Sequence, residues 1–494
     1  MAYMQSYPNQ TYLIPPKLTD LFSEDHICYL IEQITNEIDY SKFDQKYSGA
    51  GHPAYHPRIN LKLFMMAGVD KISSSRVIAK NSQENVVYIY LAEKVKPNFR
   101  TISDFRMNHP ELIAQASLQL KMFGLKRGLI DLSQIFIDGT KIIANVNNDR
   151  VIDKETIEKL KKYIDKQIEE GIKVDKEEDK LYGDKGMHEL PDDLNDDEKR
   201  RPAVKQIVRE INKAIIGNEK EKAESIKKKL EKIDAKTEGK NVCSVTDPDS
   251  RYMKNRGLGK KLSYNAQMAV DKNGIILFED VTQNAVDKNE LLPVMNGIEK
   301  DFGQLPKGTT VSADAGYEKG EAMEELDKRG YELLIPGKTS EKRFFKSNFS
   351  YDEKKDKFIC PEGKPLEKRG KTFQKKYQRY LTIYLGTECP NCPHQKECCK
   401  TAKYRPLHIL PQDKLFQRIK NKLQSEEGKA KYKLRKQTVE TVFGDIKENK
   451  KLRKFVLRGT KKVKTEWVLA SISRNLIRIN NLLKRDGISL ASDC

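Results

Sequence analysis

The sequence predicts a mixed α/β protein built from several units, and three observations support this prediction. Apolar segments in the middle of the chain follow the order strand, strand, strand, helix, strand, helix, strand. The chain has 494 residues, which is too long for a single hydrophobic core. Charged residues make up 33% of it and are distributed unevenly, so that some segments read as separate charged helices.

The N-terminal part of the chain, residues 1–125, reads mainly as helices. Apolar residues recur there at helical spacing from Leu18 onward, and Pro97 interrupts the pattern. The pattern then changes, because Ser133–Gly139 alternates between apolar and polar residues as a half-buried strand does. This strand carries Asp138. We therefore expect a helical N-terminal domain that ends near residue 125.

A hairpin and a helix are predicted further along the chain. Leu262–Val270 is a strand candidate, Asp271–Gly274 (DKNG) is a turn signal, and Ile275–Val281 is the returning strand. Asp287–Glu290 has the spacing of a capping box and would open a helix over Leu291–Ile298. We assign Asp287 to that cap.

Two more strands alternate with a helix. Thr309–Ala313 is a strand that ends at Asp314, Glu318–Arg329 is a helix, and Tyr331–Ile335 is a strand. A trio of hairpin-connected strands followed by strand–helix alternation is the order of the ribonuclease-H-like fold, which is the predicted catalytic core.

The rest of the chain extends this core. Residues 126–150 and 241–340 form it, and 151–240 is a charged helical insertion with 23 basic and 24 acidic residues. We read two helices there, joined by a looser acidic stretch around 191–198, and interpret them as a spacer without chemistry. Residues 341–410 form a Cys-containing insertion, and 411–494 form C-terminal helices.

The net charge of +20 is concentrated at the C-terminal end of the chain. Residues 401–494 hold 24 basic and 9 acidic residues, a net charge of +15, and Lys447–Lys464 holds nine basic residues and one acidic residue. Such an excess favours a polyanionic partner, nucleic acid before a membrane surface. The alternative is an ordinary solvated face, which is what a charge run usually is.

The predicted topology would bring acidic residues that are distant in the sequence together in one candidate site. Asp138 and Asp314 would converge at one edge of the sheet, and Glu440 lies on a later helix with an apolar stripe. Phosphodiester cleavage uses two divalent ions about 4 Å apart, held by clustered carboxylates. Oxygen ligands favour Mg²⁺ or Mn²⁺. Taken singly, each acid is more often a cap or a surface charge.

Several blocks of the sequence resemble one family. The segments FIDGTKIIANVN, VSADAGYEKGE and YKLRKQTVETVFGDIKENK are similar to the three catalytic blocks of the DDE-type transposases of bacterial insertion sequences. The resemblance covers nearly the whole chain. It implies that Asp138, Asp314 and Glu440 are a catalytic triad that binds two Mg²⁺ or Mn²⁺ ions.

The resemblance also implies DNA-contacting residues around Glu440. Tyr432, Arg435 and Lys447 match the partners in a Tyr-Arg-Glu-Lys signature, but four residues separate Arg435 from Glu440 where the signature has three. Basic side chains here would contact DNA phosphates, and the alternative is surface cations that stabilise a helix. The predicted DNA-binding residues are Tyr432, Arg435, Lys447, Lys450, Lys451, Arg453 and Lys454.

The family implies an enzyme that cleaves DNA and transfers strands. Its partners would be the inverted-repeat ends of the element and the target DNA, bound by a homodimer, with the N-terminal domain recognising the ends. Two alternatives remain: a ribonuclease-H-like nuclease or resolvase that does not join strands, and a domesticated, catalytically inactive DNA-binding protein.

A cysteine cluster lies between the second and third acids. A structural Zn²⁺ is our hypothesis for it, and reduced thiols in a loop-rich subdomain are the alternative. Cys399 and His394 are possible replacement ligands. The four expected ligands are Cys360, Cys389, Cys392 and Cys398.

The expected location is the bacterial cytoplasm, with association to the nucleoid when the protein is bound to DNA. The N-terminal residues do not have the pattern of a signal peptide, and eight Cys in this length are no disulfide framework. The longest apolar run, Leu63–Val69, is too short to span a bilayer, so no membrane partner is expected.

Overall fold

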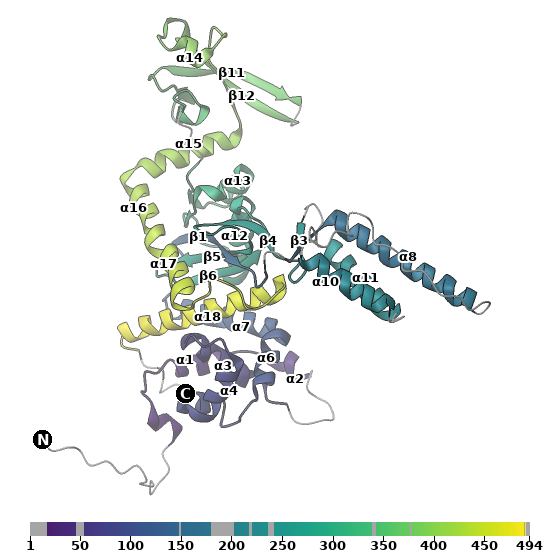
Figure 1. Cartoon of the computed structure of the whole chain (residues 1–494). Coiled ribbons are helices and arrows are strands. Elements are labelled where there is room, and N and C mark those ends of the chain that lie inside the picture. The colour runs from purple at the N-terminus through teal and green to yellow at the C-terminus, as the bar shows by residue number, and fades with distance from the viewer. Residues whose placement is uncertain are drawn as a thin grey trace, which may run out of the picture.

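The computed structural model describes residues 17–45, 54–147, 150–178, 202–216, 220–235, 242–337, 342–375, 378–488 and 490. The described part is elongated (Figure 1). N-terminal helices lie at one end, a mixed sheet lies in the middle, a small β-rich unit lies at the other end, and a helical arm projects sideways. The predicted mixed α/β class is confirmed.

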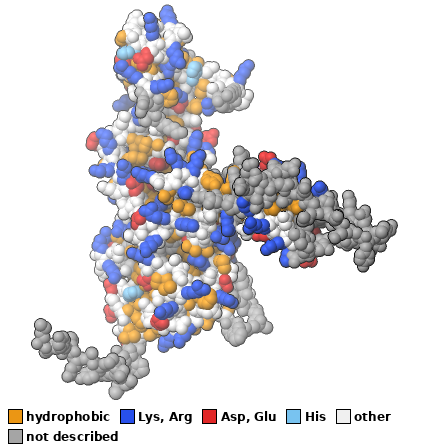
Figure 2. Space-filling model, in the orientation of Figure 1, with side chains coloured by type: hydrophobic (Ala, Val, Ile, Leu, Met, Phe, Trp, Pro, Cys, Tyr) orange, Lys and Arg blue, Asp and Glu red, His pale blue; other side chains and the backbone are white. Residues whose placement is uncertain are grey.

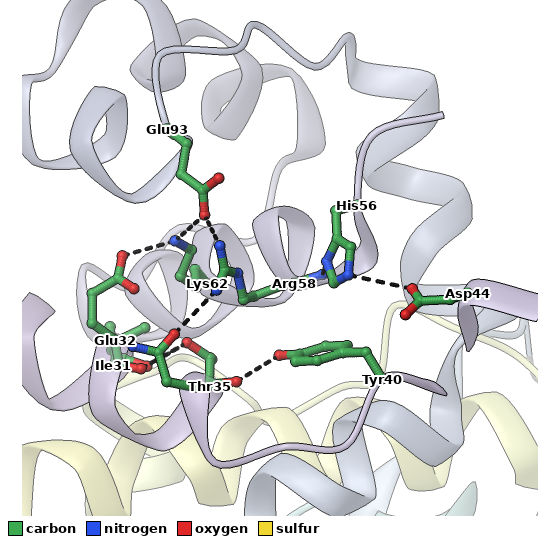
Figure 3. Close-up of polar contacts among 10 residues, drawn as sticks. Ile31, Glu32, Thr35, Tyr40, Asp44, His56, Arg58, Lys62 and Glu93 are labelled. Carbon is green, nitrogen blue, oxygen red and sulfur yellow. Dashed lines mark hydrogen bonds and ion pairs between the residues drawn. The ribbon is translucent and has the colours of Figure 1, made fainter. Parts of the chain in front are cut away.

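The N-terminal helices pack around a buried lysine. Lys62 is 1% exposed, and its Nζ lies 2.7 Å from Glu32 Oε1 and 2.9 Å from Glu93 Oε1 (Figure 3). A buried ammonium is costly unless it is paired, so these contacts fix α3 against α1 and against the turn after α5. The elements are η1 (Leu18–Leu21), α1 (Cys28–Asn36), α2 (Ser41–Asp44), α3 (Pro57–Val69), α4 (Ser75–Glu84), α5 (Val86–Leu91), α6 (Phe99–Asn108) and α7 (Pro110–Lys126).

The central sheet has the order β4-β5-β1-β7-β8, and β6 also pairs with β5. β5 is antiparallel to β1 and to β6, whereas β7 is parallel to β1 and β8 to β7. The predicted succession of strands and helices is confirmed, and β4 was not foreseen. The elements are β1 (Gln134–Ile143), β4 (Arg251–Asn255), β5 (Gly259–Asp271), β6 (Ile276–Thr282), α12 (Leu291–Phe302), β7 (Thr310–Ser312), α13 (Gly320–Lys328) and β8 (Glu332–Leu334).

The sheet is covered on both faces. One face, which includes Ile135 and Ile137, shares a continuous core with α12, α13 and the N-terminal helices. The opposite face packs against the helices near Glu440. The final helix, α18 (Thr460–Arg485), contributes to both cores, and its Asn475 donates from Nδ2 to Ile276 O and accepts from Ile276 N–H, each at 2.8 Å. α18 therefore ties the sheet to the N-terminal helices (Figure 1).

The helical arm begins and ends at a short antiparallel pair, β2 (Val151–Asp153) and β3 (Val242–Ser244). Among the described residues it contains three helices, not the two expected: α8 (Lys154–Glu178), α10 (Pro202–Ile216) and α11 (Lys220–Ala235). Buried apolar residues of these helices form a separate core. The predicted acidic stretch at 191–198 lies outside the described residues.

The small unit holds an antiparallel sheet of order β13-β12-β11-β10-β9, which was not predicted because its strands are short or strongly polar. A compact core around Phe349, Phe358 and Tyr384 lies beneath it. α15 (Pro411–Gln424) and α16 (Glu426–Arg435) lead back toward the central sheet (Figure 1). The elements are η5 (Lys346–Asn348), β9 (Ser350–Asp352), β10 (Lys357–Ile359), β11 (Pro365–Gln374), β12 (Arg379–Gly386), η7 (Cys389–Asn391), α14 (Gln395–Cys399) and β13 (Pro406–Ile409).

Within the described ranges, none of the helices combines the length and the apolar character needed to cross a lipid bilayer.

Candidate active site

The three predicted carboxylates line one cavity of about 620 Å³. Asp138, Asp314 and Glu440 come from β1, from the end of β7 and from the helical segment after α16. Basic side chains surround them, so the cavity combines an acidic centre with a cationic wall. The described basic residues that line it are Lys141, Lys254, Arg256, Arg435, Lys447 and Arg453.

Strand register brings the two aspartates together. Phe136 of β1 pairs with Ser312 of the parallel strand β7. Asp138 and Asp314 are each two residues further on, so they stand at the same level on adjacent strands. Asp314 is also the N-cap of the turn η4 (Ala315–Tyr317), where its Oδ1 accepts a hydrogen bond of 2.9 Å from Gly316 N–H.

The carboxyl group of Asp138 is buried, and its pKa is perturbed. Burial raises the pKa of its carboxyl to about 6, and the nearby charges of Asp314 and Asp287 act in the same direction, while Arg435 opposes the rise. Arg435 Nη2 lies 3.0 Å from Asp138 Oδ2. A carboxylate that is buried beside other negative charges favours a cation as its partner.

Glu440 lies in a helix that is widened by two π-helical turns. These are η8 (Lys436–Glu440) and η9 (Asp445–Asn449), and α17 (Thr441–Gly444) lies between them. The predicted apolar stripe is confirmed, since its members are buried against the sheet: Val439, Val442, Phe443 and Ile446.

The first π turn accounts for the unusual spacing before Glu440. A π turn closes over one residue more than an α turn. η8 therefore accommodates the additional residue between Arg435 and Glu440, and Arg435 Nη1 lies 3.8 Å from Glu440 Oε1. The arginine and the glutamate thus face the same cavity.

Other predicted DNA-binding residues also reach this region. Lys447 Nζ donates a hydrogen bond to Thr140 Oγ1 on β1, and burial lowers the pKa of this lysine. Tyr432 Oη donates to Ala313 O at 3.4 Å, next to Asp314. Arg453 lines the cavity and pairs with Glu448.

The remaining predicted lysines do not line the cavity. Lys450 is drawn toward the N-terminal helices, where its Nζ donates to Gly68 O at 3.0 Å, and burial lowers its pKa to about 8. Lys451 and Lys454 are exposed on the segment that follows η9. Of this basic cluster, Lys450 therefore makes a contact between two parts of the fold.

The assignment of Asp287 to a helix cap is wrong. Its turn, η3 (Asp287–Asn289), precedes α12, whose N-cap residue Glu290 makes no capping side-chain bond. Asp287 Oδ1 instead accepts from Lys141 Nζ at 3.0 Å, from Asn265 Nδ2 at 2.7 Å and from Gln267 Nε2 at 2.8 Å.

This network supports the strand that carries Asp138. A Cβ added at Gly139 would come within 2.4 Å of Gln267 Nε2 and 2.6 Å of Asp287 Oδ1, so a side chain larger than hydrogen does not fit there. Sequence reasoning missed Lys141 because strand alternation assigns it to the face opposite Asp138. Lys254 and Arg256 were missed because β4 was not predicted.

The donor set fits divalent cations. Among the described residues, no three carboxylate, imidazole or thiol side chains are already gathered as a metal-binding group. Asp138, Asp314 and Glu440 nevertheless face one cavity, and their oxygen atoms are the ligands that Mg²⁺ and Mn²⁺ prefer. A cation there would also offset the burial and the neighbouring negative charges that raise the pKa of Asp138.

Five of the eight cysteines gather in the small unit, which lies between Asp314 and Glu440 in the sequence. Cys360, Cys389, Cys392, Cys398 and Cys399 line one cavity of about 30 Å³. His394 does not line it, and its ring nitrogens lie 3.8 Å from carboxylate oxygens of Glu362 and Glu397. Of the two alternative ligands considered above, Cys399 is the one at the cavity.

Two tight turns present these thiols. In the first, Lys364 N–H donates to Cys360 Sγ at 3.3 Å, and Gly363 has a φ of +77° that suits glycine. In the second, Cys392 N–H donates to Cys389 O at 3.1 Å. The sulfur atoms are thereby brought to one side of the unit.

Comparisons with known proteins match parts of this chain to transposases. The family model described as "Transposase DDE domain" matches residues 359–480, and "Transposase domain (DUF772)" matches residues 16–108. The transposase for insertion sequence element IS1106 of Neisseria meningitidis serogroup B is 27% identical over 163 residues, 32% of this chain. The match spans about half of that relative, 53% of its length. Two separate parts of the chain, residues 16–108 and 359–480, are therefore similar to domains of transposases.

Proposed function

We propose that the protein is a transposase that cleaves DNA at the ends of its insertion sequence and transfers the strands to target DNA. The observation that carries this proposal is the cavity in which three carboxylates, from three separate segments, are ringed by basic side chains. A phosphate backbone is attracted by the cationic wall, and the carboxylates supply the ligands for catalytic metal ions.

We also propose that the core is ribonuclease-H-like. The strand order β6-β5-β1-β7-β8, with β5 antiparallel to β1 and with β7 and β8 parallel, supports this. The helical arm and the small Cys-containing unit would be insertions, because each leaves the core between two of its elements. On this division the core comprises 126–150 and 241–340.

Asp138, Asp314 and Glu440 would hold two Mg²⁺ or Mn²⁺ ions. When bound, such ions would supply activation of an attacking water and stabilisation of the leaving 3′ oxygen, and the freed 3′-hydroxyl would then attack the target. Arg435 and Lys447 would hold phosphate oxygens beside the acids. Lys141, kept in place by Asp287, would supply a third positive charge at the cavity wall.

The proposed partners are the inverted-repeat ends and the target duplex. The N-terminal helices, where one transposase model matches, would recognise the ends. Because two ends must be cut and joined together, we propose that a homodimer assembles on DNA, associated with the nucleoid of a bacterial cell.

Two assays in Mg²⁺ test this function: a cleavage assay with intact ends and a strand-transfer assay with pre-cleaved ends. We expect joined products from the wild type and none from Asp138→Ala, Asp314→Ala or Glu440→Ala, with DNA binding retained in all three. Cleavage without joining would identify a nuclease or resolvase instead. Binding without either reaction would identify a catalytically inactive DNA-binding protein.

We further propose that the cysteine cavity holds one structural Zn²⁺. Thiolates are preferred zinc ligands, and a small unit gains stability from a metal staple. Zinc analysis of the purified chain should give one equivalent, which Cys389→Ser with Cys392→Ser removes. Cys243→Ser, in the core of the arm, is the matched control and should retain the zinc. A wild type without zinc contradicts this proposal.

A further inference from the structure

The β11–β12 hairpin is the most exposed β-structure of the small unit, and the preceding proposal gives it no role. It projects from the rest of that unit (Figure 1). Its strands pair from Leu366–Gly386 at the base to Gln374–Arg379 at the tip. Toward the tip both strands lie mostly in solvent, although Leu381, opposite Thr372, is buried there, as Leu366 is at the base.

An aromatic pair stands near this tip. Phe373 and Tyr380 are opposite each other in the register, with ring centroids 4.9 Å apart. Phe373 is 42% exposed and Tyr380 is 67% exposed. Two neighbouring aromatic rings in solvent gain nothing for the hydrophobic core of the unit, so their exposure favours a contact with a partner.

The charge of the hairpin identifies the class of partner. The segment 368–380 (KRGKTFQKKYQRY) contains six basic residues and no acidic residue. Lys368 pairs with Asp356 at 3.1 Å near the base. Among the described residues, no carboxylate lies within 4.0 Å of the cationic group of Arg369 or Lys371.

The strand geometry places several of these groups on one face. Side chains alternate along a strand, so Lys371 shares a face with Phe373 and, across the ladder, with Tyr380. The register shifts between Lys368 and Gly370, and such a bulge re-aims the intervening Arg369. Positive charge therefore flanks the aromatic pair.

We propose that the β11–β12 hairpin is a DNA-binding ribbon that enters a groove of the duplex held by the transposase. A two-stranded ribbon fits the major groove, basic side chains contact phosphates, and exposed rings pack on bases or sugars. β11 has ten residues and is about 33 Å long at about 3.3 Å per residue, which matches about one helical turn. The hairpin thus extends the footprint beyond the catalytic cavity. This inference rests on the proposed function.

The experiment measures equilibrium binding of the full chain, in EDTA, to a duplex about six helical turns long that carries one end of the element. Arg369→Gln with Lys371→Gln should lower the affinity about 10-fold or more and reduce the slope of log K against log salt by about 2. Phe373→Ala with Tyr380→Ala should weaken binding about 5-fold or more with little change in slope.

Lys354→Gln with Lys355→Gln is the matched control. These exposed lysines lie on the turn between β9 and β10 of the same unit, so the charge change is identical. The control should bind as the wild type does. Circular dichroism and thermal melting of each variant confirm that the fold is retained.

Three outcomes are informative in different ways. Hairpin variants that bind like the control would overturn the ribbon proposal while leaving the transposase proposal intact. A wild type that binds no duplex would refute the proposed function itself. If the wild type dimerises without DNA and the aromatic variant alone becomes a monomer with unchanged DNA binding, the hairpin is an interface between copies, and the ribbon proposal fails.

Discussion

The helical arm and the C-terminal helices are both rich in lysine, but their charges are used differently. In the arm, cations pair with acids of the arm itself, as in Lys161 Nζ to Asp234 Oδ2 at 2.8 Å and Lys227 with Asp165. In the C-terminal helices, Arg435 and Lys447 reach across to β1, at Asp138 and Thr140. Similar residue types therefore pair with one another in the arm and line a cavity with acidic residues in the other region. Figure 2 shows that Lys and Arg side chains are scattered over the visible face of the molecule.

The largest effect expected from this difference concerns single carboxylates. Asp314→Asn removes a proposed metal ligand and should lower the rate of DNA cleavage at least about 100-fold, because metal ions supply several kcal/mol of transition-state stabilisation. Asp234→Asn, the same change in the arm, should alter the rate by less than about two-fold, because this partly buried ion pair lies in the arm and does not line the cavity. Equal rates for the two variants would contradict the comparison.

Double substitutions of basic residues test whether the two regions differ in DNA binding. Lys447→Gln with Arg453→Gln removes two charges from the cavity wall and should weaken duplex binding about 10-fold, with a salt slope smaller by about 2. Lys161→Gln with Lys227→Gln removes two charges from the arm and should leave affinity and slope unchanged. Fluorescence anisotropy over a range of salt concentrations measures both. A slope that falls equally in the arm variant would mean that the arm also contacts DNA.

The two regions should also differ in how charge affects stability. The pKa of Asp138 is raised to about 6 from an unfolded value near 3.8, so stability from its neutral form is present below pH 4 and is lost as pH rises through 6. In EDTA at pH 8, Asp138→Asn should therefore increase the free energy of unfolding by about 2 kcal/mol. The gain should vanish near pH 4.

Denaturant unfolding at both pH values tests this difference. Asp165→Asn in the arm is the control, and it should change stability by a few tenths of a kcal/mol at either pH because that ion pair is exposed. A pH-independent effect of Asp138→Asn would show that its carboxyl is not destabilised by burial.

The smallest effect is expected when the arm is removed. Asp153 of β2 pairs with Val242 of β3, so a short Gly-containing turn can close the gap left by deleting 154–241. The shortened chain should bind the duplex within about three-fold of the full chain and should melt at nearly the same temperature, since the arm has its own core. Loss of binding would reveal a function for the arm.

Local patterns predicted much of the fold. Alternation identified the strands around Asp138 and at Leu262–Val270, and the DKNG turn is confirmed by Gly274 with a φ of +76°. The strand β11 was missed because it is nearly all polar and exposed, so no alternation is visible in it. The third helix of the arm was missed because its apolar spacing continues that of the helix before it.

The candidate site was also predictable only where its residues lie in local sequence patterns. Asp138, Asp314 and Glu440 lie in distinctive blocks, and the structure brings them to one cavity. The contacts of Asp287 with Lys141 and Gln267 join residues that are distant in the sequence, and no spacing reveals them. The widening of the helix at η8 is likewise hidden, because its apolar stripe still reads as helical.

The π turn η8 has a consequence for the insertion or deletion of a residue in this helix. A residue gained inside an α-helix would normally rotate everything beyond it by about 100° and turn Glu440 away from the sheet. Because η8 takes up the additional residue between Arg435 and Glu440, α16 before it and α17 after it keep the orientation that they would have without that residue. A chain without this residue would therefore present the same side of the helix, with Glu440, to the cavity.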